Sequence, residues 1–311
     1  MIDILNFDFM QNALLASLLV SVICGVIGTL TVINRMVFIA GGIAHGSYGG
    51  IGLALYFGIA PMLGASLFSL FLGAIIAYIT HQNNARLDAL IGVLWAFGMA
   101  LGIIMTDLTP GYNVDLMSYL FGAILSVTQE DIYGMSTVLV AVLAFAIIFY
   151  KQLLAMSFDA QFAKLRGINV TLLYFALVLM VALGVVIIIR AVGLILVIAL
   201  LTIPPYIAEK FTNSVGGMMV VSSLLSALFC IVGLYLSYSF NLSGGASIIL
   251  VATTTFFAQL LYSKYIKSLT AFFRLRYCSI KYEPSSAISI PHKIITAPHI
   301  CGKVNNSFAK K

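Results

Sequence analysis

A histidine in a long uncharged stretch is the residue best suited to contact a metal ion. His45 lies in the segment AGGIAHGSYGGIG at 40–52, which contains six glycines. Ionisable side chains in membrane-crossing segments usually face the bundle interior or a water-filled path. Neutral imidazole is also a common ligand of transition metals. His45 is therefore a candidate metal contact, and the alternative is a histidine that only hydrogen-bonds to a neighbouring helix.

The glycines around His45 predict close contacts between helices. Gly42 and Gly46, and likewise Gly46 and Gly50, are four residues apart. Small residues at this spacing lie on one face of a helix and let another helix backbone approach closely.

A second irregular stretch follows an apolar segment and reads ALLTIPPYIAEKFTNS at 199–214. Proline is favoured in the first turn of a helix, because its missing N–H would be unpaired there anyway. We therefore expect a span to end at the prolines and a short helix to follow at the cytoplasmic surface. It carries Pro204, Pro205, Glu209 and Lys210. This helix is either a plain connector or a docking element for a cytoplasmic partner.

The sequence lacks the usual signatures of an enzyme. It contains no GxxxxGK[ST] phosphate loop, no HExxH motif and no GxSxG motif, so we expect neither nucleotide hydrolysis nor a permanently bound cofactor. Cys24, Cys230, Cys278 and Cys301 show no CxxC spacing, and we expect unpaired thiols. In the tail, His292 and His299 join Cys301 as potential ligands, but three ligands without a fourth leave a metal site incomplete.

The composition indicates the elements that position these residues. The 311-residue chain is 62% hydrophobic and 8% charged, with a mean hydropathy of +1.11. Soluble domains carry about 25% charged residues, and a spanning helix needs about 20 apolar residues. We therefore expect an all-α, polytopic transmembrane helical bundle of about 8–10 spans. The nine spans that we place are 11–33, 37–57, 62–80, 88–106, 131–150, 170–189, 192–208, 217–238 and 245–263. The stretch 112–127 is a tenth candidate, which fits a partial or re-entrant helix better.

The distribution of Lys and Arg predicts the orientation. With the N-terminus outside, the loops that carry Arg35 and Arg86 face the cytoplasm, and Arg190 is the one exception to the positive-inside rule. Residues 264–311 have a net charge of +8, whereas the rest of the chain sums to −2. We therefore expect a membrane domain at 1–263 and a disordered basic cytoplasmic tail at 264–311. The tail is attracted to anionic membrane lipid rather than to nucleic acid.

Several motifs along residues 10–263 resemble one family, the membrane permease subunits of bacterial ABC importers for zinc, manganese or iron. The matching segments are RMVF (35–38), IAHGS (43–47), DALIGVL (88–94), DLMSYLFGAIL (115–125), FDAQFA (158–163), VGLILVIALLTIP (192–204) and LSGGASIILVAT (242–253). The resemblance implies a multi-pass protein of the bacterial inner membrane. It also implies a second copy of the chain around a central path past His45, cytoplasmic ATP-binding subunits coupled through the segment after Pro204, and an external metal-binding protein.

The chain departs from the family pattern at one position near His45. In many relatives an Asp precedes this His by four residues, which places two ligands on one helix face. Here that position is Gly41. Since manganese prefers oxygen ligands, the missing carboxylate favours zinc as the transported metal.

Three other functions fit parts of the sequence. A permease for metal chelates such as siderophores or cobalamin needs a wide polar cavity, which the glycine-rich second span disfavours. An ion-coupled secondary transporter usually shows inverted repeats and acids at the membrane midplane, and neither is visible. A purely structural membrane subunit would tolerate loss of His45 and of the 204–214 segment.

Overall fold

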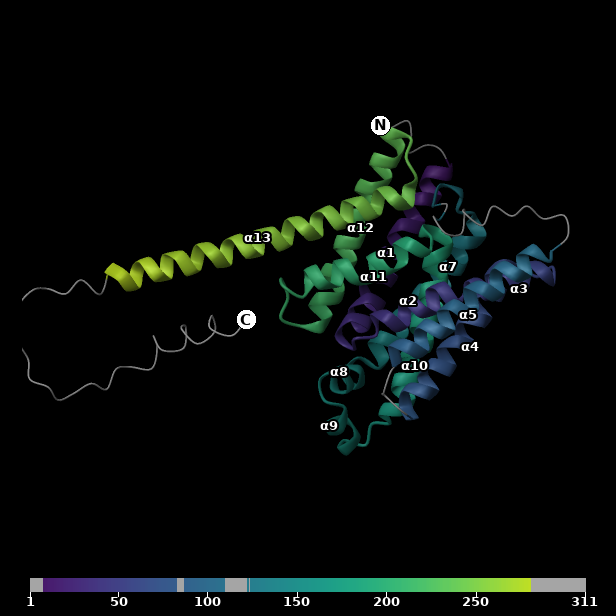
Figure 1. The fold of residues 1–311 in the computed structure, drawn as a ribbon, viewed down its shortest axis with the longest axis horizontal. Helices are drawn as coiled ribbons and strands as arrows, with labels where there is room; N and C mark the ends of the chain where they lie inside the picture. Colours follow the sequence, from purple (N-terminus) through teal and green to yellow (C-terminus); the bar gives the residue numbers. More distant parts are fainter. Residues whose placement is uncertain (1–7, 83–86, 110–121, 123, 281–311) are drawn as a thin grey trace, which may run out of the picture. The chain divides into compact units, whose positions relative to one another are not determined.

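The computed structural model describes residues 8–82, 87–109, 122 and 124–280, and all regular elements in these ranges are helices (Figure 1). The predicted all-α fold is therefore confirmed. The helices are α1 (Asp8–Ile33), α2 (Val37–Gly46), α3 (Tyr48–Tyr56), α4 (Pro61–Gln82), α5 (Leu87–Asp107), η2 (Ile124–Ser126), α7 (Gln129–Ile148), α8 (Tyr150–Phe158), α9 (Ala160–Leu165), α10 (Val170–Val192), α11 (Leu194–Ala208), α12 (Val215–Phe240) and α13 (Gly244–Ile280).

Within the described ranges, eight helical segments are long and apolar enough to cross a membrane. One of them joins α2 and α3 into Val37–Tyr56. The remaining predicted span, 192–208, corresponds to α11, which has only 15 residues. At ~1.5 Å per residue α11 is about 22 Å long, shorter than a bilayer core of about 30 Å. The re-entrant helix predicted at 112–127 lies mostly outside the described residues.

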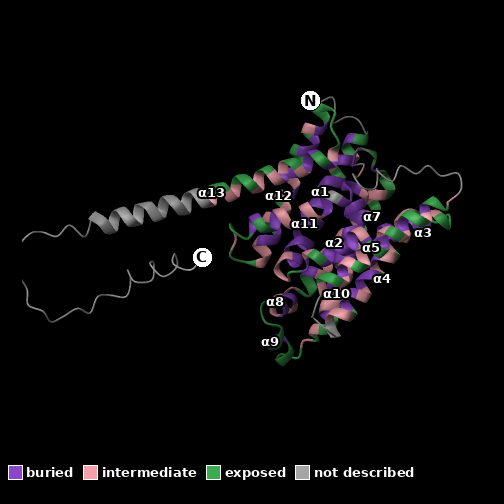
Figure 2. Cartoon of the chain, in the orientation of Figure 1, coloured by how far each residue is buried: buried purple, intermediate pink, exposed green. Residues whose placement is uncertain are grey.

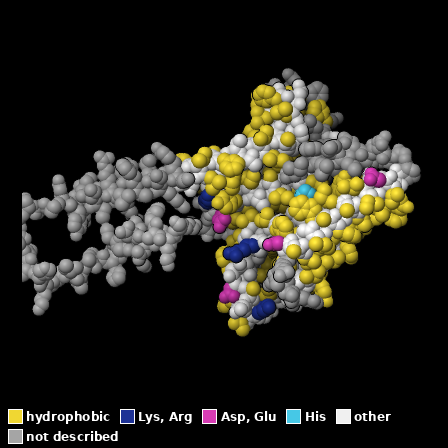
Figure 3. Space-filling view, in the orientation of Figure 1, with side chains coloured by type: hydrophobic (Ala, Val, Ile, Leu, Met, Phe, Trp, Pro, Cys, Tyr) yellow, Lys and Arg dark blue, Asp and Glu magenta, His cyan; other side chains and the backbone are white. Residues whose placement is uncertain are grey.

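Two compact units divide the chain, residues 1–261 and 262–311. In the first unit, α1, the α2–α3 segment and α10 have the most buried spans, whereas less than a quarter of each of the α5 and α7 spans is buried (Figure 2). The outer surface consists largely of hydrophobic side chains with few charges (Figure 3). This pattern suits a bundle whose exterior faces lipid. Cys24 and Cys230 are buried and form no disulfide, as predicted.

Glycines pack the α2–α3 segment tightly between α4 and α5. A Cβ built on Gly98 of α5 would collide with the carbonyl oxygen of Gly46, and one on Gly50 would collide with that of Gly64 in α4. The predicted close helix contacts at Gly46 and Gly50 are therefore confirmed. These contacts hold α2 and α5 together, which matters because α2 carries His45.

The prediction that a separate short helix begins at Pro204 is wrong. Both prolines lie inside α11, which continues to Ala208 and is followed by a turn. The next helix, α12, begins only after Ser214, whose hydroxyl accepts a hydrogen bond from the Gly217 N–H at 3.1 Å.

Packing against α1 explains why α11 continues through its prolines. Each proline leaves the carbonyl four residues earlier without its intrahelical donor. For Pro205 this is the carbonyl of Leu201, and a Cβ on Gly28 of α1 would lie 2.7 Å from that oxygen. The glycine therefore lets the α1 backbone cover the weakened turn of α11, and this packing is not visible in local sequence.

The second unit also differs from the sequence prediction. Disorder is expected from residue 264, but α13 continues as a helix to Ile280. The reason is that 264–280 contains neither Gly nor Pro, and adding residues to an existing helix avoids the cost of starting a new one. Residues 281–311 lie outside the described ranges, so disorder there stays a prediction.

Candidate functional site

His45 lies in the last turn of α2, where its ring stacks on the indole of Trp95 in α5. The ring centroids are 4.2 Å apart and the planes differ by 10°. The imidazole is half-buried, and its Nδ1 is buried without a hydrogen-bond partner among the described residues. Trp95 is anchored in turn, because its Nε1–H donates to Met99 Sδ at 3.0 Å. The structure thus holds His45 by a ring contact and leaves Nδ1 without a hydrogen bond to the described residues.

The position four residues before His45 contacts an apolar side chain. A Cβ on Gly41 would lie 3.3 Å from Ile198 Cδ1 of α11. The described part of the chain contains no group of three or more His, Cys, Asp and Glu side chains that could hold a metal ion. Among the described residues His45 therefore stands as a single metal donor, without the further ligands of a closed metal site.

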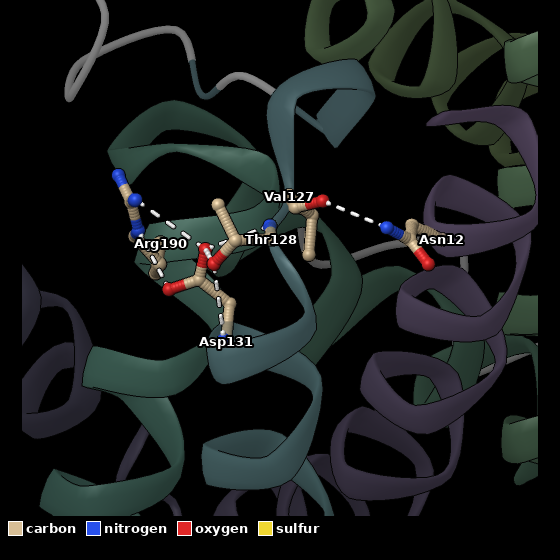
Figure 4. Close-up of polar contacts among 5 residues, drawn as sticks. All are labelled: Asn12, Val127, Thr128, Asp131 and Arg190. Carbon is tan, nitrogen blue, oxygen red and sulfur yellow. Dashed lines mark hydrogen bonds and ion pairs between the residues drawn. The ribbon is translucent and has the colours of Figure 1, made fainter. Parts of the chain in front are cut away.

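A second polar group lies where α10 ends, which we call the Arg190 end of the bundle. Arg190 binds Asp131 of α7 through two hydrogen bonds, Nε to Oδ1 at 3.1 Å and Nη2 to Oδ2 at 3.3 Å (Figure 4). Asp131 also accepts from the Thr128 N–H at 3.0 Å and from its hydroxyl at 2.9 Å. The Asp131 N–H donates to the Thr128 hydroxyl oxygen at 3.3 Å, which completes a capping box with the first of these bonds. Nearby, Asn12 Nδ2 of α1 donates to the Val127 carbonyl at 3.4 Å. This arrangement joins α1, α7 and α10.

A cavity of about 200 Å³ lies beside the ion pair. Its lining includes Asp131, Arg190, Ser47 at the α2–α3 junction, and Pro61 at the start of α4. Ser47 lies two residues after His45 in the sequence, but His45 itself does not line the cavity. The His45–Trp95 stack and the Arg190–Asp131 ion pair are therefore separate features of the molecule.

The predicted coupling residues divide between the core and the surface. Pro204 and Pro205 are buried in α11, whereas Glu209 and Lys210 are exposed in the turn that follows. Lys210 Nζ donates to Gln259 of α13 at 3.0 Å and lies 4.7 Å from the centre of the Tyr206 ring.

Glu209 lines a groove of about 470 Å³ at the opposite end of the bundle, which we call the Arg35 end. The groove brings together three connections that are distant in the sequence. They are the α1–α2 turn with Arg35, the α8–α9 junction with Phe158, and the α11–α12 turn from Glu209 to Ser214.

The α8–α9 segment is a functional candidate that the sequence analysis missed. Asp159 caps α9, its Oδ1 accepting from the N–H groups of Gln161 and Phe162 at 2.9 Å. Phe158 and Leu165 are 74% and 87% exposed. The preceding span ends at Ile148 and the following one begins at Val170, so these apolar side chains lie outside both spans. The sequence does contain an indication of this segment: Asp159, a residue type that caps helices, lies between Phe158 and Phe162. The same stretch carries part of the family resemblance.

The chain is similar to several known membrane proteins. Residues 6–263 match the profile of the ABC 3 transport family. The chain is 49% identical over 264 residues to an uncharacterised membrane protein of Synechocystis sp., covering 85% of this chain and 94% of that protein. It is 33% identical over 260 residues to the manganese transport system membrane protein MntC of Listeria monocytogenes, covering 84% and 92%. The solved structure of PsaBC from Streptococcus pneumoniae in complex with Fab contains a similar chain, with 34% identity, a TM-score of 0.75, and coverage of 83% of this chain and 93% of that one.

Proposed function

Because this chain belongs to the ABC 3 transport family, we propose that it is the membrane permease of a metal importer driven by separate ATP-binding subunits. The names of two relatives, the manganese transport membrane protein MntC and the manganese import permease ScaB, support a metal as the cargo. The absence of a phosphate loop from the sequence supports ATP hydrolysis by another protein. A metal-binding protein delivers the ion to the outer face, and two copies of the chain form the path.

The observation that carries this proposal is the unpartnered nitrogen of His45 within the helical bundle. A buried polar atom without a hydrogen bond is costly, and such atoms persist where they serve a purpose. A divalent transition metal passing His45 supplies the missing partner and is released again because one nitrogen holds it weakly. This combination suits a conduit.

Manganese is the cargo that we propose, because relatives at 33% and 34% identity carry manganese in their names. Zinc is the second candidate, since His45 supplies nitrogen and Gly41 lacks the oxygen ligand that manganese prefers. Uptake of radioactive manganese by cells that express the permease with its ATPase and binding protein, with zinc or a siderophore as competitor, separates these cargoes. Competition by the chelate but not by either free ion would overturn the proposal.

We assign the Arg35 end to the cytoplasm, in agreement with the predicted orientation. The ATP-binding subunits then dock on the groove at this end. The exposed apolar side chains of α9 supply the contact, and the Glu209–Ser214 turn transmits movement to α11 and α12. Coupling is predicted for Pro204, Pro205, Glu209 and Lys210, and we propose that α8 and α9 share this role. The two prolines are buried and can contribute only by moving with α11.

Replacement of Leu165 by Ser tests the docking surface. Loss of an apolar anchor from a protein interface costs about 2 kcal/mol or more, so co-purification of the ATPase should fall about 30-fold. The matched control is Leu242→Ser, because Leu242 is 53% exposed and lies between α12 and α13, at the end predicted to face outward. Equal ATPase recovery with both variants would remove α9 from the interface. Metal uptake driven by an ion gradient without ATPase subunits would instead indicate a secondary transporter.

A further inference from the structure

His45 is oriented by an aromatic ring rather than by a hydrogen bond. The usual support for a metal-binding histidine is a carboxylate or carbonyl that accepts a hydrogen bond from its second nitrogen. Here Nδ1, the nitrogen proposed to meet the ion, has no hydrogen-bond partner among the described residues, so no bond at this nitrogen orients the ring. A Cβ at Gly41 would lie against Ile198, so the described neighbour at this position is apolar. The contact that the structure does provide is the nearly parallel stack on Trp95.

Trp95 is suited to hold a neighbouring ring because it is itself held. Its indole N–H donates to Met99 one turn further along α5, and this contact restrains rotation of the indole. The backbones of α2 and α5 are also held close together, since a Cβ on Gly98 would collide with the backbone of Gly46, and one on Gly42 would collide with Ile91 of α5. A rigid indole on a rigid helix therefore limits the imidazole to rotation within the plane of the stack.

We propose that Trp95 is a positioning residue that keeps the imidazole of His45 aimed at the transported metal. Its role replaces that of a hydrogen-bonding partner, and the ligand class is a divalent transition-metal ion that accepts one imidazole nitrogen. This inference rests on the proposed function, because it presumes that His45 contacts the cargo. It adds that the affinity at His45 depends on a residue that does not touch the ion.

The chain contains one tryptophan, so its fluorescence reports directly on this stack. The purified full-length permease is titrated with Mn²⁺ and with Zn²⁺ while tryptophan emission is recorded. Saturable quenching or a spectral shift is expected for the unmodified chain, and His45→Ala should abolish the response. In the absence of metal, His45→Ala should also change the Trp95 emission, because the stacked ring is lost. A metal response that is unchanged in His45→Ala would overturn the inference.

Transport by variants at position 95 separates positioning from packing. Trp95→Leu should raise the KM for metal about tenfold, the lower end of the 10–100-fold cost of losing support for a metal ligand. Trp95→Phe, which still stacks, should keep the KM within about threefold. Phe97→Leu is the matched control, since Phe97 is an aromatic residue of the same helix that is 54% exposed.

The outcomes distinguish this inference from the proposed function. A KM for Trp95→Leu equal to that of the unmodified chain, together with loss of uptake in His45→Ala, overturns positioning by Trp95 and leaves the metal path intact. Unchanged uptake in both variants contradicts the path itself. If Trp95→Leu does not fold, the KM of Trp95→Phe and the metal-free fluorescence of His45→Ala still test the inference. An unchanged emission spectrum in His45→Ala would refute the stack.

Discussion

Two polar groups within the apolar helices differ in their hydrogen bonding. At the Arg190 end, Arg190 and Asp131 form two hydrogen bonds with each other, and Thr128 supplies two more donors to the carboxylate. At His45, the ring is stacked but Nδ1 has no hydrogen-bond partner in the described part of the chain. A satisfied ion pair ties helices together, whereas an unsatisfied nitrogen is free for a ligand. This difference is what we expect if the ion pair is structural and His45 meets the proposed metal.

The same comparison resolves an irregularity in the charge pattern. Arg190 is the one basic residue that breaks the predicted orientation. Its partner Asp131 is only 14% exposed, so the arginine neutralises a carboxylate that would otherwise be buried without a countercharge. Arg190 is therefore explained by its local partner.

The largest effect is expected from removing the unsatisfied group. His45→Ala should lower metal uptake about 100-fold, equivalent to roughly 2.7 kcal/mol. The purified chain should lose only about 1 kcal/mol of stability, because a ring stack but no hydrogen bond is lost. Initial uptake rates and a melting curve in detergent measure the two quantities. Strong destabilisation with normal uptake per folded molecule would reverse the roles given to the two groups.

The converse is expected at the ion pair. Arg190→Met leaves Asp131 without its countercharge and should destabilise the chain by about 1–3 kcal/mol, below the 3–5 kcal/mol of a fully buried pair because Arg190 is partly exposed. The melting temperature in detergent measures this loss. Asp131→Asn combined with Arg190→Met should recover most of the stability, and the comparison fails if the double variant is as unstable as the single one.

A smaller effect is expected from adding the missing acid beside His45. Gly41→Asp places a carboxylate four residues before His45, on the same helix face, and should raise manganese affinity about tenfold, within the range of changes around metal ligands. Ile198 Cδ1 must shift by a few tenths of an ångström, since a Cβ would lie 3.3 Å away. Tryptophan fluorescence titrations measure the affinity, and Gly41→Asn controls for size without charge. Equal manganese affinities for the two variants would show that the carboxylate does not reach the ion.

The smallest effect is expected at the edge of the satisfied group. Asn12 donates to the Val127 carbonyl at 3.4 Å, a long hydrogen bond. Asn12→Ala should therefore cost about 0.5 kcal/mol, the lower end for a hydrogen bond, with no change in uptake. The melting temperature should fall by much less than in Arg190→Met, and an equal fall would place Asn12 at the centre of this group.

The Arg35 end of the bundle shows a further limit of local sequence pattern. The prolines at 204–205 suggest a helix start, yet they lie within α11 because α1 packs over the turn that they weaken. The capping Asp159 and its apolar neighbours are visible in the sequence, but their exposure at the Arg35 end is visible only in the fold. Which residues reach the surface depends on the neighbours of each helix.

The sequence by itself determined the helical membrane fold, most span positions and the glycine-mediated packing around His45. Hydropathy and the spacing of small residues are properties of a single helix, so they can be read without knowing which helix lies beside it. The tertiary structure alone decided that His45 stacks on Trp95 and that Arg190 pairs with Asp131, partners 50 and 59 residues apart in the numbering. Such pairs depend on how separate helices are rotated against one another. That rotation is set by packing across the whole bundle rather than by any short stretch of sequence.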